Sequence, residues 1–197
     1  MKIAPSNDAA QILADRYLSS FQFSEKHGIA GIKAPVDVIL AAIKNYDDRS
    51  DRVVNFLQAT REVPSRIAAA LGGKNALAER ARFGLADFFQ LEETGNEIAL
   101  GLIGRFWKFD YGLVQIKDAG EFLNFAAPGY GKLVMIWSVV PGTGGANQLL
   151  TETRVFCPDR QSRLLFSLYW IAIRLASGWI RTRVLAQLKS DAENAAV

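Results

Sequence analysis

The feature that most constrains this chain is a long apolar run near its end. Residues 164–180 read LLFSLYWIAIRLASGWI, with Arg174 as the one charged residue inside the run. Apolar side chains recur there at helical spacing on a broad face, as Leu165, Tyr169 and Ile173 show. Because a face this wide needs to be covered by other parts of the protein, the sequence predicts a helix buried in the core.

The ends of this helix can be predicted from single residues. The carboxylate of Asp159 can accept hydrogen bonds from first-turn amides, and Gly178 is expected to break or kink the helix. Residues 179–189 then continue as an amphipathic segment. A run of about 17 residues is at the short limit for crossing a bilayer, and it contains an arginine. A buried helix is therefore favoured over a transmembrane helix, with an interfacial helix as a third option.

Composition narrows the class of protein. The chain has 197 residues, half of them hydrophobic, which is enough for one domain with a sizeable core. Its 23 basic and 20 acidic residues nearly balance, which argues against a nucleic-acid partner. His27 is the single histidine and Cys157 the single cysteine, so we expect neither a metal site nor a cofactor. The first residues do not resemble a secretory signal, which predicts a cytoplasmic protein, and the oligomeric state is left open.

The first half of the chain reads as one strand followed by helices. Residues 1–22 are expected to form an N-terminal helical appendage. Residues 21–32 alternate as a strand, and the phase breaks at residues 30–31, which predicts a bulge. One helix should begin at Pro35, and a second is predicted in residues 52–71. Two helices therefore follow the first strand.

After Gly84 the pattern changes to the period of strands joined by short turns. The glycine-containing segments PGYGK and PGTGG lack the Gly-Lys-Ser/Thr ending of a phosphate-binding loop, and we predict them to be hairpin turns. Residues 191–197 are expected to be a flexible tail. The predicted strands are residues 85–93, 97–107, 113–116, 121–126, 130–140 and 147–157.

This order of elements resembles the helix-grip fold of the START, birch-pollen-allergen and polyketide-cyclase superfamily, often called SRPBCC. The segments that carry the likeness are FSEKHGI, GLIGRFWKFD, FAAPGYGKLVMIW, LLTETRVFC and YWIAIRLASGWIRTRVLAQLK, which are similar to a bacterial group of unassigned function. The resemblance implies an α+β domain over residues 23–190. A curved antiparallel sheet of about six to seven strands would wrap around the long C-terminal helix, with two helices between the first and second strands.

What the resemblance implies for function is a cavity between sheet and helix that holds a hydrophobic or amphipathic small molecule. Members of the superfamily include lipid carriers, hormone receptors, cyclases and oxygenase subunits, so the fold alone does not decide the activity. We favour a ligand-binding protein over an enzyme. The alternatives are a polyketide cyclase or dehydratase, and a partner-binding or membrane-surface protein. In the last case, the basic end of the helix, with Arg181 and Arg183, would make peripheral contact with a membrane.

Charged side chains inside strands, and aromatic ones on the apolar helix, are the candidates for ligand binding. Glu25 and His27 share one face of the first strand, and Arg105 or Arg174 is expected to pair with Glu152. The residues predicted to bind the ligand are His27, Arg105, Trp107, Trp137, Glu152, Phe166, Tyr169, Trp170, Ile173 and Arg174.

The same residues allow an enzymatic hypothesis. His27 and Glu25 could act as general acid and base on a ketone or polyketide, while Arg105 stabilises an enolate. Ordinary cross-strand salt bridges on the outer face of the sheet would require the same residue types. The sequence leaves this choice open.

Overall fold

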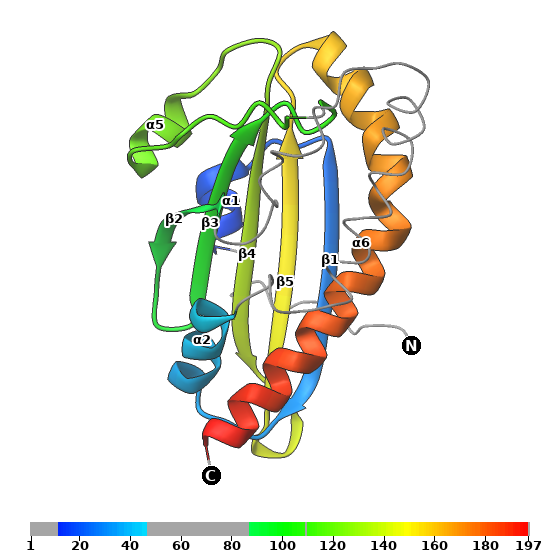
Figure 1. Cartoon of the computed structure of the whole chain (residues 1–197). Helices are drawn as coiled ribbons and strands as arrows, with labels where there is room; N and C mark the ends of the chain where they lie inside the picture. Colours follow the sequence, from blue (N-terminus) through cyan, green and yellow to red (C-terminus); the bar gives the residue numbers. More distant parts are fainter. Residues whose placement is uncertain (1–11, 47–86, 109, 197) are drawn as a thin grey trace.

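The computed structural model describes residues 12–46, 87–108 and 110–196, apart from the side chains of residues 172, 173 and 175–177. The described part is α+β: one open sheet of five antiparallel strands, with helices on both of its faces (Figure 1). Its helices and strands are α1 (Ile12–Leu18), β1 (Phe23–Ile32), α2 (Val36–Asn45), β2 (Phe89–Glu93), β3 (Glu97–Gly104), α5 (Ala119–Asn124), β4 (Gly131–Pro141), the 3-10 turn η3 (Thr143–Gly145), β5 (Asn147–Phe156) and α6 (Arg160–Ala195).

The strand order is β1-β5-β4-β3-β2, so the first strand pairs with the last. The antiparallel sheet and the long C-terminal helix confirm the coarse α+β prediction. The sheet in the described part has five strands, fewer than the six to seven expected. In Figure 1, α6 and α2 lie in front of the sheet and α1 behind it.

The predicted bulge in β1 is confirmed. The pairing of β1 with β5 shifts register between Ile29 and Ile32, and Gly31 has a φ of 74°. Glycine adopts this left-handed conformation without steric cost. The ammonium group of Lys189, on α6, donates to the carbonyl oxygens of Ala30 at 3.2 Å and Gly31 at 2.8 Å. The bulge is therefore also a contact point between β1 and the end of α6.

The helix predicted after the first strand is α2. Pro35 stands directly before it, where a fixed φ suits a helix start, and Ile39, Leu40 and Ile43 form its buried side. These three side chains pack in one cluster with residues of α6. The second predicted helix, in residues 52–71, lies outside the described residues.

The connection between β3 and β4 differs from the prediction. Residues 121–126 are not a strand, because α5 occupies Ala119–Asn124. The carboxylate of Asp118 accepts a hydrogen bond from the Glu121 amide at 2.7 Å, and this cap favours the helix over the alternating pattern. The strand predicted at residues 113–116 is reduced to a single bridge between Val114 and Ile103.

The helix α6 runs without interruption from Arg160 to Ala195. Gly178 does not break it, because one glycine costs a helix interior only about 1 kcal/mol and the apolar side continues beyond it. Val184, Leu188 and Ala192 on that side are buried, so the segment predicted as a flexible tail is helical through Ala195. None of the helices described is long and apolar enough to pass through a bilayer.

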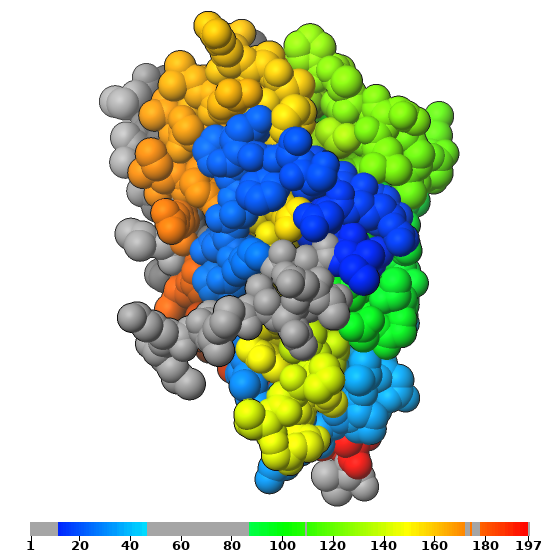
Figure 2. All heavy atoms as spheres, turned by 180° about the vertical axis from the view of Figure 1, so that it is seen from behind, coloured from blue at the N-terminus to red at the C-terminus, as the bar shows by residue number. Residues whose placement is uncertain are grey.

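The helix α1 covers the face of the sheet opposite α6. Leu13 and Ala14 are fully buried there, against a cluster that includes Val134 and Ile136 of β4. Figure 2, seen from behind, shows α1 lying across this face beside α5. The helix that the sequence suggested as an appendage is thus part of the packed domain.

Candidate functional site

The register of the sheet aligns side chains from four strands into rows on the face toward α6. Successive side chains of a strand point to opposite faces, so every second residue contributes to a row. One row contains Glu25, Thr153, Met135 and Leu100, and the next contains His27, Thr151, Trp137 and Ile98. Both rows are polar on β1 and β5 and become apolar on β4 and β3.

The polar half of these rows includes a hydrogen-bonded pair. Nε2 of His27 lies 2.9 Å from Oε1 of Glu25, and both side chains are largely buried. The helix passes directly over this pair at Gly178. A Cβ atom at Gly178 would lie 3.5 Å from Oε1 of Glu25 and 3.6 Å from Cε1 of His27. These are ordinary contact distances, so a methyl group fits here and only a longer side chain would press on the pair.

One turn further along α6, Arg181 reaches the same rows. Its Nη2 donates to Oγ1 of Thr153 at 2.6 Å, and its Nη1 is 3.5 Å from Oγ1 of Thr151. Burial lowers the pKa of the guanidinium below its ordinary value, and the charge of Glu25 opposes that shift. We refer to Glu25, His27, Thr151, Thr153 and Arg181 as the polar cluster.

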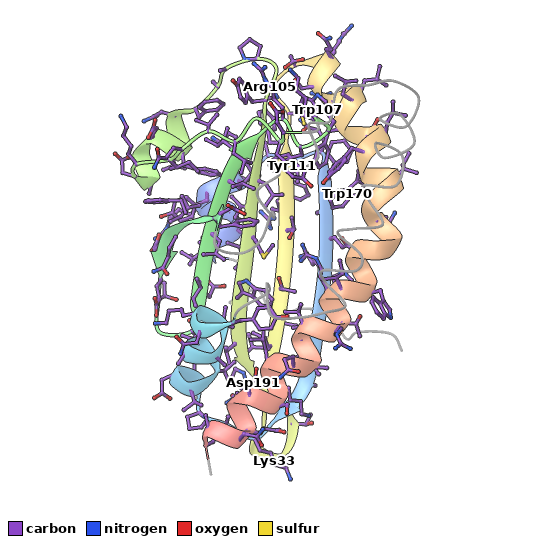
Figure 3. All side chains as sticks on the ribbon, in the orientation of Figure 1. Lys33, Arg105, Trp107, Tyr111, Trp170 and Asp191 are labelled. Atoms are coloured by element: carbon purple, nitrogen blue, oxygen red, sulfur yellow. The ribbon has the colours of Figure 1, made fainter. Side chains whose placement is uncertain are left out.

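Apolar side chains lie on both sides of the polar cluster along the strands. Toward one end, Phe166 of α6 is buried with its ring 4.8 Å from that of Phe23 and 5.9 Å from that of Phe106. Figure 3 shows Trp107 and Trp170 at this same end. We call Phe23, Phe106, Trp107, Phe166, Tyr169 and Trp170 the aromatic cluster. Toward the other end, α6 and α2 bury aliphatic residues such as Leu149 and Leu188.

The centre of the α6 face is less covered than the opposite face. Leu100, Leu133 and Met135 lie on the central strands β3 and β4, yet each is only partly buried. On the opposite face of the same strands, Val134 and Ile136 are at most 2% exposed. The middle of a sheet is normally its most covered part, so the α6 side retains accessible apolar surface beside the polar cluster.

Trp137 lies in the same row as His27 and adds an unused hydrogen-bond donor. Its side chain is buried, and its Nε1 has no hydrogen-bond partner among the residues that the structure describes. A buried indole N–H without an acceptor is costly, by about 1–3 kcal/mol. A bound molecule with an acceptor would remove that cost.

The structure brings together part of the predicted set. Glu25 and His27 share a face as expected, and Trp137 lies in a row with His27. The aromatic residues predicted for the ligand, Trp107, Phe166, Tyr169 and Trp170, all belong to the aromatic cluster. The side chain of Ile173 is outside the described part.

Other predicted residues lie elsewhere, which corrects the expected pairings. Glu152 points to the opposite face, where it accepts a hydrogen bond from Nε of Arg154 at 2.8 Å. Arg105 follows the end of β3, and its guanidinium lies 4.3 Å from the ring centre of Tyr130. Arg174 is exposed on α6. Neither arginine pairs with Glu152, so these three residues do not contribute to the polar cluster.

The sequence prediction missed Thr151, Thr153 and Arg181. The threonines alternate along β5 with Glu152 and Arg154. The charged pair was the stronger signal for a binding site, but it lies on the face opposite α6. Arg181 belongs to the segment 179–189, which the sequence predicts to be amphipathic, with Arg181 among its polar residues. Its position next to the threonines depends on the angle at which α6 crosses the sheet, which no local pattern encodes.

No metal centre accompanies the polar cluster in the part of the chain that is described, where no three His, Cys, Asp or Glu side chains are grouped to hold an ion. Comparison with protein-family models and with curated proteins gives no match. The geometry of the α6 face is therefore the basis for a functional assignment.

Proposed function

We propose that the protein binds a hydrophobic or amphipathic small molecule between the sheet and α6. The observation that carries this proposal is that the two central rows combine polar side chains with apolar ones. Apolar Leu100 and Met135 are only partly covered, and they lie in one row with Glu25 and Thr153. Binding sites for small molecules combine apolar walls with a few polar groups that orient the ligand.

The two flanking clusters support the same proposal. The aromatic cluster and the aliphatic core hold α6 to the sheet on both sides of the central rows. Leu100 and Met135, between these clusters, can therefore stay partly uncovered without loss of the fold. A ligand there would cover Leu100 and Met135, and about 25 cal/mol would be gained for each Å² of apolar surface removed from water.

The test combines detection of a natural ligand with a blocked variant. Native mass spectrometry and organic extraction of the purified protein should reveal a co-purifying small molecule. Titration with the neutral dye Nile red should show saturable binding, and Met135→Trp should weaken it at least about tenfold by filling the space. Leu168→Trp places the same indole on the exposed side of α6 and should bind the dye as the wild type does. Absence of both ligand and dye binding, or an unaffected Met135→Trp, would refute the proposal.

A second candidate function, catalysis, is favoured by the hydrogen bond between His27 and Glu25. Such a pair can transfer protons to and from a ketone or polyketide, and Arg181, rather than Arg105, is the cation nearby. If the protein is a cyclase or dehydratase, His27→Ala should abolish turnover of a polyketide substrate. If it is a carrier, the same change should alter only the affinity for Nile red or the extracted ligand.

A third candidate, contact with an anionic membrane surface, is favoured by an apolar stripe on α6. Leu164, Leu168, Ile171 and Trp179 follow each other at helical spacing and are 51% to 72% exposed. Residues 160–190 contain no acidic side chain, and Arg160 flanks the stripe. A lipid surface with negative head groups fits this charge, whereas a second copy of α6 would meet its own positive charge.

Flotation with vesicles separates this candidate from the others. The protein should bind vesicles that contain phosphatidylglycerol more strongly than vesicles of phosphatidylcholine alone. Leu168→Glu combined with Ile171→Glu should abolish that binding, whereas Leu123→Glu, at an exposed position of α5, should not. Equal flotation of the double variant and the wild type would argue against the membrane surface.

A further inference from the structure

We infer that the ligand carries an anionic group, such as a carboxylate, that pairs with Arg181. This inference rests on the proposed binding function and adds the chemical class of the ligand. It starts from the partners that Arg181 has within the protein. The two threonine hydroxyls are neutral, so they accept hydrogen bonds from the guanidinium without balancing its charge.

Arg154, on the strand β5, provides the comparison. Arg154, on the opposite face of β5, is also buried, but its guanidinium donates to the carboxylates of Glu152 at 2.8 Å and Asp15 at 2.5 Å. Burial disfavours its charge, yet these carboxylates outweigh burial and raise its pKa. Arg154 thus has the counter-charges that a buried cation requires.

Among the described residues, Arg181 has no such counter-charge in contact. Within the part of the chain that is described, no carboxylate lies at ion-pair distance from its guanidinium. Glu25 acts on it only through space, and Oε1 of Glu25 is engaged by His27 at 2.9 Å. A guanidinium offers five N–H donors in a fork that matches a carboxylate, and the threonines use few of them. The remaining donors are available to an anion.

The residues around Arg181 indicate what the rest of such a ligand would look like. The buried Nε1–H of Trp137 is a further donor without an acceptor among the described residues. Trp137 and Thr151 are neighbours across β4 and β5, so the indole lies in the row next to the threonine that Arg181 approaches. From there the rows lead over Met135 to Leu100, both apolar and partly covered. A molecule with a carboxylate at one end and an apolar chain, like a fatty acid, matches this order.

A pair of probes that differ in one charge tests this inference. We would titrate the full-length protein with dansyl-labelled undecanoic acid and with its methyl ester. The acid should bind the wild type at least about tenfold more tightly than the ester, because a charge-assisted hydrogen bond contributes that much. Arg181→Met should remove the preference for the acid, so that the acid and the ester bind this variant with equal affinity. Arg174→Met, which removes an exposed arginine of the same helix, should keep the preference.

The outcomes distinguish the two levels of the proposal. Equal binding of the acid and the ester by the wild type would overturn the inference of an anionic ligand but leave the binding function intact. This comparison uses the wild type alone, so it does not depend on whether a variant folds. A preference for the acid that survives in Arg181→Met would also overturn the role of Arg181. If neither probe nor Nile red binds, the proposed function itself is refuted.

Discussion

Nη1 of Arg154 donates a hydrogen bond to Oδ1 of Asp15 at 2.5 Å, which joins β5 to a helix 139 positions earlier in the chain. The same nitrogen donates to the carbonyl oxygen of Leu18 at 3.2 Å, at the end of α1. Because the Arg154 side chain is 4% exposed and that of Asp15 is 67% exposed, the two partners differ in what their loss would cost.

We therefore expect Arg154→Met to lower the free energy of unfolding by about 3 kcal/mol, since it leaves Glu152 buried without its arginine. Asp15→Ala should cost less than about 1 kcal/mol, because an exposed carboxylate is solvated either way. Urea denaturation measures both. Adding Glu152→Gln to Arg154→Met should recover part of the loss. A variant Arg154→Met as stable as the wild type would mean that α1 is held by its apolar contacts alone.

The cap of α6 makes stability depend on pH in the acid range. Hydrogen bonds from the Gly129 amide and from Ser162 lower the pKa of Asp159 to about 2. A carboxylate whose pKa falls on folding stabilises the protein above its unfolded pKa, near 4, and this contribution is lost as the pH falls toward 2. We expect Asp159→Ala to lower the melting temperature by a few degrees at pH 6, and the difference from the wild type to vanish near pH 2.

The matched control is Asp110→Ala, which removes an exposed carboxylate from the loop after β3. Its melting curve should follow that of the wild type at every pH. A constant difference between Asp159→Ala and the wild type from pH 6 to pH 2 would show that the carboxylate is not what supports the helix start.

Local patterns in the sequence located most of the helices and strands, but they did not show which side of each strand faces α6. Period-two alternation placed Glu25 and His27 together, and the helical spacing located α6. In β5 the two alternating sets are equally mixed: Thr151 and Thr153 on one face, Glu152 and Arg154 on the other. Because neither set is clearly more apolar, the sequence could not tell which one faces α6.

The residues of the polar cluster that the sequence did not predict are brought there by contacts between distant segments. Arg181 meets Thr153 from 28 positions away, across the crossing of α6 over the sheet. That crossing is set by packing of the aromatic cluster at one end and of Leu185 and Leu188 at the other. The segment around Phe122 was mispredicted for a local reason. Its alternating pattern is typical of a strand, but the cap that Asp118 provides stabilises a helix instead.

Cys157 should be chemically inert in the folded protein. Burial, and secondarily the charge of Asp159, raises the pKa of its thiol to about 12, so almost no reactive thiolate exists at pH 8. We expect the native protein not to react with a disulfide reagent such as DTNB, and full reaction after unfolding in guanidinium chloride. In a Cys157→Ser background, Ser190→Cys on the exposed side of α6 should react within minutes. Rapid labelling of Cys157 in the folded wild type would contradict its burial.

Gly178 allows a prediction that connects stability with the site. A methyl group there would meet Glu25 and His27 at ordinary contact distances of 3.5 and 3.6 Å, so Gly178→Ala should be accommodated. Alanine is also the better helix former, and we expect a gain of about 0.5–1 kcal/mol in unfolding free energy. The longer side chain of Gly178→Leu should press on the Glu25–His27 pair and weaken binding of dansyl-labelled undecanoic acid.

Gly104 provides the contrast, because a Cβ atom there would lie 2.9 Å from the backbone oxygen of Tyr111 and 2.9 Å from Cδ2 of Leu113. The backbone cannot move aside as a side chain can, so Gly104→Ala should lose about 1–3 kcal/mol in urea denaturation. The same added methyl group is thus expected to raise the free energy of unfolding in Gly178→Ala and to lower it in Gly104→Ala. If Gly178→Ala were destabilised as strongly as Gly104→Ala, a Cβ atom at Gly178 would have to lie closer to Glu25 and His27 than 3.5 Å, which would argue against the proposed binding site beside His27.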